Sequence, residues 1–193
     1  MQAGQSGSAV QGDPISRYVV GVAGLSGEPM GRTQFQKMFF LISREVPSLG
    51  NMLDYRPGMF GPYSDVLERS LRNLERDGMM ELEAKSGYKL LQLTKRGRDV
   101  CADAPCDVED RVASLLPDYL DLFRDMEHHE MLAYVCLMFP EMTANPMNRP
   151  QMQSELKSCV MPLIIKRKIT SQRGSELLEI PHSEVMDELK AWI

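Results

Sequence analysis

The sequence has few cysteines, no long apolar run and no leader-like start, and each absence narrows its class. It contains no run of about 18 apolar residues, the length that a membrane-spanning helix needs. Residues 1–12 have neither the charged start nor the apolar centre of a secretory signal, so we expect a disordered tail over 1–13. The cysteines form no Cys-x-x-Cys pair, which favours reduced thiols over a zinc or redox motif. We therefore expect a cytoplasmic protein with no membrane association.

The signatures of common enzymes are also absent. The chain has no Gly-x-Ser-x-Gly elbow, no P-loop and no paired-glycine dinucleotide motif. His128 and His129 lie beside two glutamates, but consecutive histidines on a helix point about 100° apart and cannot both face one ion without partners elsewhere. We expect no catalytic residues, no metal site and no cofactor, and so a protein that is not an enzyme.

Charge is divided unevenly along the chain. The 193 residues hold 22 lysines and arginines and 27 aspartates and glutamates, a net charge of −5. Residues 1–103 hold 13 of the basic and 12 of the acidic side chains, whereas residues 104–193 hold 9 and 15. Because nucleic acid is a polyanion, the acidic second half is better suited to a protein partner.

The most informative pattern begins with a helix expected over residues 64–77. Its apolar side chains recur every three or four positions and so face a core, and Ser64 can cap its first turn. Gly78 ends it, because glycine takes a left-handed conformation without steric cost. The expected apolar stripe is Tyr63, Val66, Leu67, Ser70, Leu71 and Leu74.

A hairpin and a further helix follow. Residues 79–83 and 88–93 are short enough for strands, and residues 85–87 supply turn chemistry between them. Thr94 then offers a hydroxyl that can cap the next helix. The segment therefore reads as helix, hairpin, helix.

The remaining segments are expected to be helical around a few loops. Thr33 and Gln36 have capping-box spacing at the start of a helix that runs to Pro47, and Pro47 to Pro62 reads as a loop. We expect the domain boundary at Ala104–Pro105, between domains over 14–104 and 105–193. The other expected helices cover 14–25, 94–104, 108–116, 119–126, 130–139 and 151–168, with breaks at Pro117 and Pro140, and a pair over 170–193 capped by Thr170 and Ser183.

Three strings carry a family resemblance. One resembles the wing region of MarR-like and PadR-like winged-helix proteins; it comprises Leu71, Leu74, Gly78, Tyr88, Leu90, Leu93, Thr94, Gly97 and Arg98. Residues 32–42 and 61–64, RTQFQKMFFLI and GPYS, are similar to YwgA-like prokaryotic winged-helix proteins and more loosely to SocA-like antitoxin domains. Residues 166–189 resemble the C-terminal helix-turn-helix of small antitoxin-like proteins, but differ in Gly174 and in having few basic groups on the last helix.

The resemblance implies a mainly α fold with a small β-hairpin, in which an N-terminal winged helix-turn-helix precedes a C-terminal helical region. In such domains the third helix enters the major groove and the wing follows the adjacent backbone. Arginine can bond to guanine edges and asparagine to adenine edges, which makes these residues of helix 64–77 candidate base readers. The 15 positions from Ala84 to Arg98 hold five basic residues and no acidic one, which suits contact with phosphates. The expected DNA-binding residues are Ser64, Arg69, Arg72, Asn73, Arg76, Lys85, Lys89, Lys95, Arg96 and Arg98.

We therefore expect a prokaryotic transcriptional regulator that binds double-stranded DNA as a homodimer, because one winged helix buries little surface. The wing is expected to supply much of the affinity. An alternative is an antitoxin-like or adaptor protein that uses the winged helix for protein–protein interaction. The mixed charges on helix 64–77, where Asp65 and Glu68 accompany the arginines, and the acidic second half favour that alternative.

Overall fold

The computed structural model describes residues 13–85, 87–103, 109–144 and 156–192, without the side chains of Lys85, Tyr88 and Asp103. These residues form two compact units. The first contains the chain up to Tyr55 together with Tyr63–Leu120, and the second contains Arg56–Pro62 and the chain from Asp121 on. Residues 1–12 of the expected tail and the boundary expected at Ala104–Pro105 lie outside the described residues.

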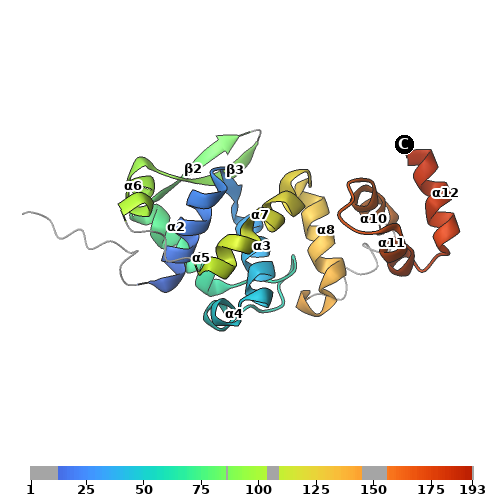
Figure 1. Cartoon of the computed structure of the whole chain (residues 1–193), viewed down its shortest axis with the longest axis horizontal. Helices are drawn as coiled ribbons and strands as arrows, with labels where there is room; N and C mark the ends of the chain where they lie inside the picture. Colours follow the sequence, from blue (N-terminus) through green and yellow to red (C-terminus); the bar gives the residue numbers. More distant parts are fainter. Residues whose placement is uncertain (1–12, 86, 104–108, 145–155, 193) are drawn as a thin grey trace, which may run out of the picture. The chain divides into compact units, whose positions relative to one another are not determined.

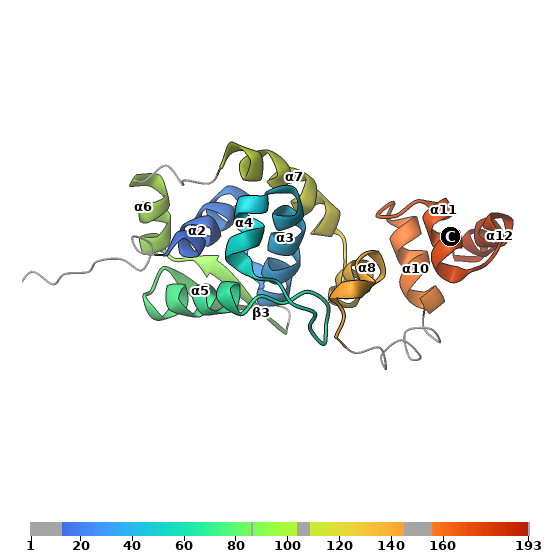
Figure 2. The ribbon, with the colours of Figure 1, turned by 90° about the horizontal axis from the view of Figure 1, so that it is seen from below.

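The fold is mainly helical with one small sheet, as expected. The helices of the first unit are α2 (Pro14–Ser26), α3 (Arg32–Glu45), α4 (Pro47–Leu53), α5 (Asp65–Arg76), α6 (Lys95–Asp103) and the greater part of α7 (Asp110–Arg124). Both α5 and α6 pack on α2, as Figure 2 shows. Among the described residues, none of the helices combines the length and apolar character that crossing a membrane requires.

The sheet of the first unit has three antiparallel strands in the order β1-β3-β2. Strands β2 (Met80–Lys85) and β3 (Tyr88–Leu93) form the expected hairpin, which extends beyond the helices of this unit in Figure 1. Strand β1 (Met30–Gly31) was not expected from the sequence; Met30 pairs with Leu91 and is buried. This order of helices and strands is compatible with a winged helix.

Helix α4 corrects the expectation of a loop from Pro47 to Pro62. Pro47 is the first residue of α4, where its missing amide costs nothing and its fixed φ suits the helix. Leu49 and Leu53 lie one turn apart and are both fully buried, so their contact with the core outweighs the turn-forming residues nearby.

The expected capping box at Thr33 and Gln36 is also wrong. Helix α3 begins at Arg32 after Gly31, with no side-chain cap. Gln36 is buried instead, and its side chain bonds to the backbone of Ser64. The side-chain amide of Gln36 thus bonds to a residue 28 positions away, which the local sequence pattern cannot predict.

Helix α7 runs through Pro117, where a break was expected. Val112, Leu116 and Phe123 are buried at helical spacing on either side of the proline. Their contact with the core offsets the hydrogen bond that Pro117 cannot donate.

The second unit contains α8 (His128–Met138), η1 (Pro140–Met142), α10 (Leu156–Ile165), α11 (Ser171–Leu178) and α12 (His182–Trp192). Its core is centred on Val160, Leu163, Ile169, Val185 and Leu189. Helix α10 packs against α8 and α11, and α11 against α12 (Figure 1). Thr170 caps α11 as expected, whereas α12 begins at His182, one residue before the expected cap at Ser183.

Candidate nucleic-acid interface

Helix α5 is fixed from its first residue. Ser64 accepts a hydrogen bond from the Leu67 amide at 3.1 Å and donates to the Leu53 carbonyl oxygen, and it is fully buried. Ser64, an expected DNA contact, is thus a helix cap whose hydroxyl offers no surface to a duplex. At the other end Gly78 takes the expected left-handed conformation, with φ 68°. Both signals that bounded this helix in the sequence are confirmed.

The core-facing stripe of α5 is narrower than expected. Leu67, Ser70, Leu71 and Leu74 are buried. Tyr63 precedes the helix and is 38% exposed, so it belongs to the surface and not to the core. Burial, followed by the carboxylates of Glu68 and Asp65, raises the pKa of the Tyr63 phenol. This aromatic side chain therefore stays a hydrogen-bond donor at neutral pH beside the first turn of α5.

The four polar candidates on α5 share the opposite stripe. Arg69, Arg72, Asn73 and Arg76 recur at positions i, i+3, i+4 and i+7, and all three arginines are exposed. Arg72 Nε lies 2.9 Å from Glu68 Oε1, and Arg76 Nε lies 3.2 Å from Asp77 Oδ1. Arg69 has no hydrogen-bond or ion-pair partner among the described residues. The candidate base readers thus lie on one face.

Arg32, at the start of α3, pairs with two of the carboxylates of α5. Its Nη1 lies 2.9 Å from Glu68 Oε1, and its Nη2 contacts Glu75 Oε2. The side chains of Glu68 and Glu75 are only 12% and 20% exposed, whereas those of Arg72 and Arg76 are 69% and 71% exposed. Glu68 and Glu75 are therefore drawn inward and the guanidinium groups outward, whereas Asp65 stays exposed at the spacing of the arginines.

The hairpin carries both signs of charge. Lys89 pairs with Ala84, whereas Glu81 and Glu83 alternate onto the other face of the same ribbon. Glu81 accepts a hydrogen bond from Gln92 at 3.2 Å. Lys85 pairs with Tyr88 next to the turn, but its side chain lies outside the described residues. The turn end of the hairpin is thus its basic part.

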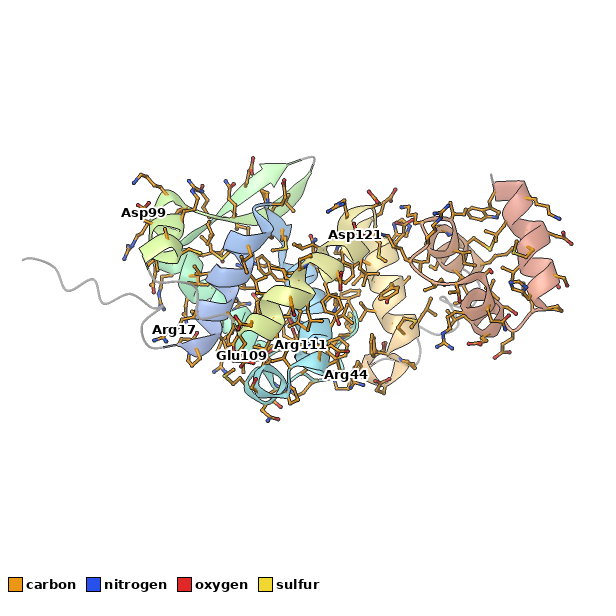
Figure 3. All side chains as sticks on the ribbon, in the orientation of Figure 1. Arg17, Arg44, Asp99, Glu109, Arg111 and Asp121 are labelled. Carbon is orange, nitrogen blue, oxygen red and sulfur yellow. The ribbon has the colours of Figure 1, made fainter. Side chains whose placement is uncertain are left out.

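The other basic residues expected in the wing lie on α6. Lys95, Arg96 and Arg98 are exposed in its first turn, roughly 15 Å from Lys89 by the rise of an extended strand. Lys95 Nζ lies 3.0 Å from Asp99 Oδ2 on the exposed side of α6 (Figure 3), and Arg98 donates to the Leu93 carbonyl oxygen. The basic run of the sequence is therefore divided between two ends of the hairpin.

A close approach places the start of α6 next to the end of α5. Thr94 caps α6 by accepting a hydrogen bond from the Gly97 amide at 3.1 Å, and its hydroxyl donates to the Gly78 carbonyl oxygen at 2.7 Å. A Cβ at Gly97 would lie 2.2 Å from the Met79 carbonyl oxygen, so only glycine fits there. Lys95 and Arg96 are consequently held near the end of α5 where Arg76 lies.

Two residues of this surface were missed by sequence reasoning. Arg32 is 36 positions from Glu68, so no local spacing links them. Tyr63 was counted with the apolar stripe because its spacing fits; the Ser64 cap, which leaves residue 63 before the helix, is the signal that excludes it.

Within the described part of the chain, no three or more His, Cys, Asp and Glu side chains gather in a group that could hold a metal ion. The candidate site is therefore the polar surface formed by α5, the hairpin and α6, where the exposed basic side chains described above gather. No protein-family model matches this chain, and no curated protein matches it.

Proposed function

We propose that the first unit is a winged-helix domain that binds double-stranded DNA, and that the protein is a transcriptional regulator acting in the cytoplasm. Helix α5 would enter the major groove, and the turn end of the hairpin would lie over the neighbouring backbone. The order of elements and the strand order β1-β3-β2 support this docking mode.

The observation that carries the proposal is the charge separation on α5. Arg32 holds Glu68 and Glu75 inward, and Arg69, Arg72, Asn73 and Arg76 lie on the outer stripe, with Asp65 as its one acidic member among the described residues. Guanidinium and amide groups on one helical face can bond to purine edges in the major groove. Lys89 and the start of α6 add positive charge at either end of the hairpin, where phosphate groups would be met.

We propose further that the regulator is a homodimer. A single winged helix buries a modest surface on DNA, and two half-sites are the usual route to operator-level affinity. The second unit is the part of the chain left to form the dimer or to dock a protein partner.

Selection from a library of random duplexes tests the regulator directly. The full chain should enrich one family of sequences, and the Arg69→Ala variant should enrich the same family less strongly, because it loses one base-reading side chain. The Arg124→Ala variant removes an arginine of the second unit and serves as the control with the same loss of charge. A library that stays random after several rounds with the wild-type chain would contradict the proposal.

Exposed apolar side chains favour protein docking as a second candidate function. Leu82 is 48% exposed on β2, on the same strand as Glu81 and Glu83, and Tyr63 is 38% exposed. The Leu82→Lys variant separates the two functions by the sign of its effect. An added charge should strengthen duplex binding if the hairpin follows DNA, and should weaken capture of a protein partner if the hairpin docks to protein.

A further inference from the structure

The turn after α10 places an arginine where glycine is expected. The Lys168 amide bonds to the Leu163 carbonyl oxygen at 2.8 Å, and the Arg167 amide bonds to that of Ile164 at 2.9 Å. This pair of bonds closes the end of a helix with one left-handed residue, which is usually glycine. Here it is Arg167, with φ 57°. Glycine would relieve this left-handed backbone, so replacing Arg167 by glycine removes the side chain without straining the turn.

Arg167 borders an apolar concavity of the second unit. The concavity is shallow and open to solvent, with a volume of about 500 Å³. Its apolar lining comes from Ile164, Ile169, Met186 and Leu189, on α10, the turn and α12. Met186 is 41% exposed, whereas Ile164, Ile169 and Leu189 are buried, so most of the apolar surface open to a ligand is that of Met186.

The charge around this concavity is positive. Arg167 and Lys168 line it, and none of its lining residues is acidic. The side chain of Arg167 is exposed and has no hydrogen-bond or ion-pair partner within the described residues. Lys168 Nζ donates to the Asp121 carbonyl oxygen at 2.8 Å and forms no ion pair within the described residues. An anion with an apolar chain could therefore contact the apolar lining and the two basic side chains at the same time.

We propose that this concavity binds a small carboxylate with an apolar chain, whose carboxylate pairs with Arg167 and Lys168 while the chain lies on Ile164, Ile169, Met186 and Leu189. The site lies wholly in the second unit, so it does not depend on whether α5 binds DNA. Ser171 adds a hydroxyl to the lining, although its Oγ already lies 2.9 Å from His182 Nε2. The two cations thus determine the preference for a charged head.

Calorimetric titration of the full chain with decanoate tests the site. Decanoate should bind one molecule per chain, whereas decanol, which has the chain without the charge, and acetate, which has the charge without the chain, should each bind at least about tenfold more weakly. Equal binding of decanoate and decanol, or no binding of decanoate, would overturn the proposal.

Arg167→Gly is the informative variant because glycine relieves the left-handed backbone and so preserves the fold. It should weaken decanoate binding by about tenfold or more through loss of the charge-assisted hydrogen bonds. Glu179→Gly is the matched control, since Glu179 caps α11 with a φ of 55° and does not line the concavity. Decanoate affinity that is unchanged in Arg167→Gly, or reduced equally in both variants, would show that Arg167 does not hold the carboxylate.

Discussion

The side-chain amide of Gln36 clamps the backbone of Ser64 from both sides. Gln36 Nε2 donates to the Ser64 carbonyl oxygen at 3.0 Å, and Gln36 Oε1 accepts from the Ser64 amide at 2.9 Å. Both residues are buried. Because Ser64 caps α5, this clamp ties the start of the candidate recognition helix to α3.

Gln36→Leu should destabilise the first unit, because it leaves the Ser64 amide buried without a partner, whereas the Ser64 carbonyl oxygen keeps its bond from the Glu68 amide at 3.1 Å. Such a group costs about 1–3 kcal/mol, so we expect a loss of about 1–3 kcal/mol in the free energy of unfolding, measured in urea. Gln92→Leu is the control; its hydrogen bond to Glu81 is exposed and should matter by less than about 0.5 kcal/mol. Equal losses of stability in the two variants would show that the buried clamp contributes no more than an exposed hydrogen bond does.

Arg32→Met should weaken duplex binding without contacting DNA itself. The variant leaves Glu75 without its ion-pair partner and Glu68 with Arg72 alone, so less of their negative charge is compensated beside the arginines of α5. We expect an increase in Kd of about five- to tenfold by fluorescence anisotropy at low salt, with little change in stability because Arg32 is partly exposed. Arg124→Met, which removes the same charge from the second unit, should leave Kd within about twofold. An equal increase in Kd in both variants would show that the net charge of the protein, and not the pairing of Arg32 with α5, explains the effect.

Glu130→Gln should destabilise the second unit in a pH-dependent way. Burial opposes ionisation of Glu130, but hydrogen bonds from Lys166 and from the Glu127 amide outweigh it, and the pKa of Glu130 is lowered. The stabilisation is therefore present above the unfolded-state pKa of about 4.3 and is lost as pH falls through the lower folded-state value. At pH 7 we expect a loss of about 1–3 kcal/mol in the unfolding free energy.

The difference between wild type and Glu130→Gln should then shrink below about pH 4. Glu176→Gln, which breaks an exposed pair with Arg173, should cost less than about 0.5 kcal/mol at every pH. A deficit in Glu130→Gln that is constant from neutral to acidic pH would mean that the carboxylate charge is not what stabilises this site.

Tyr18→Phe should reduce the loss of stability at alkaline pH. Tyr18 donates to Glu109 Oε1 at 2.9 Å, at the start of α7, where Glu109 lies in Figure 3. Burial, then the hydrogen bond and charge of Glu109, raise the pKa of Tyr18 to about 12. This contribution is full below about pH 10 and is lost as pH rises toward 12. The free energy of unfolding, measured with denaturant between these pH values, should therefore fall more steeply for wild type than for the variant. An equally steep fall with pH in both proteins would contradict this.

Local signals in the sequence were sufficient for α5 and the hairpin. Leu67, Leu71 and Leu74 give the helical period, and Ser64 and Gly78 supply a cap and a stop that act within a few residues. These features depend on neighbours in the chain, so their physical cause is visible in the sequence.

Features made by distant partners could not be predicted. Strand β1 is two residues long and exists because Met30 and Gly31 pair with β3, about 60 positions later. The same holds for the Arg32 ion pairs and for Gln36, whose amide was assigned to a local capping box. The candidate base readers were found by residue type, whereas the charge separation that exposes them required the tertiary contacts.

Duplex affinity measured from about 50 mM to about 200 mM salt tests the central claim most directly. We predict binding whose logarithm falls linearly with the logarithm of salt concentration, and a Lys85→Ala/Lys89→Ala variant that binds every duplex more weakly with a flatter slope. The Lys190→Ala variant, which removes an exposed lysine of the second unit, should keep the wild-type slope. No binding to any duplex at the lowest salt concentration, or a slope that does not change in the hairpin variant, would contradict the account.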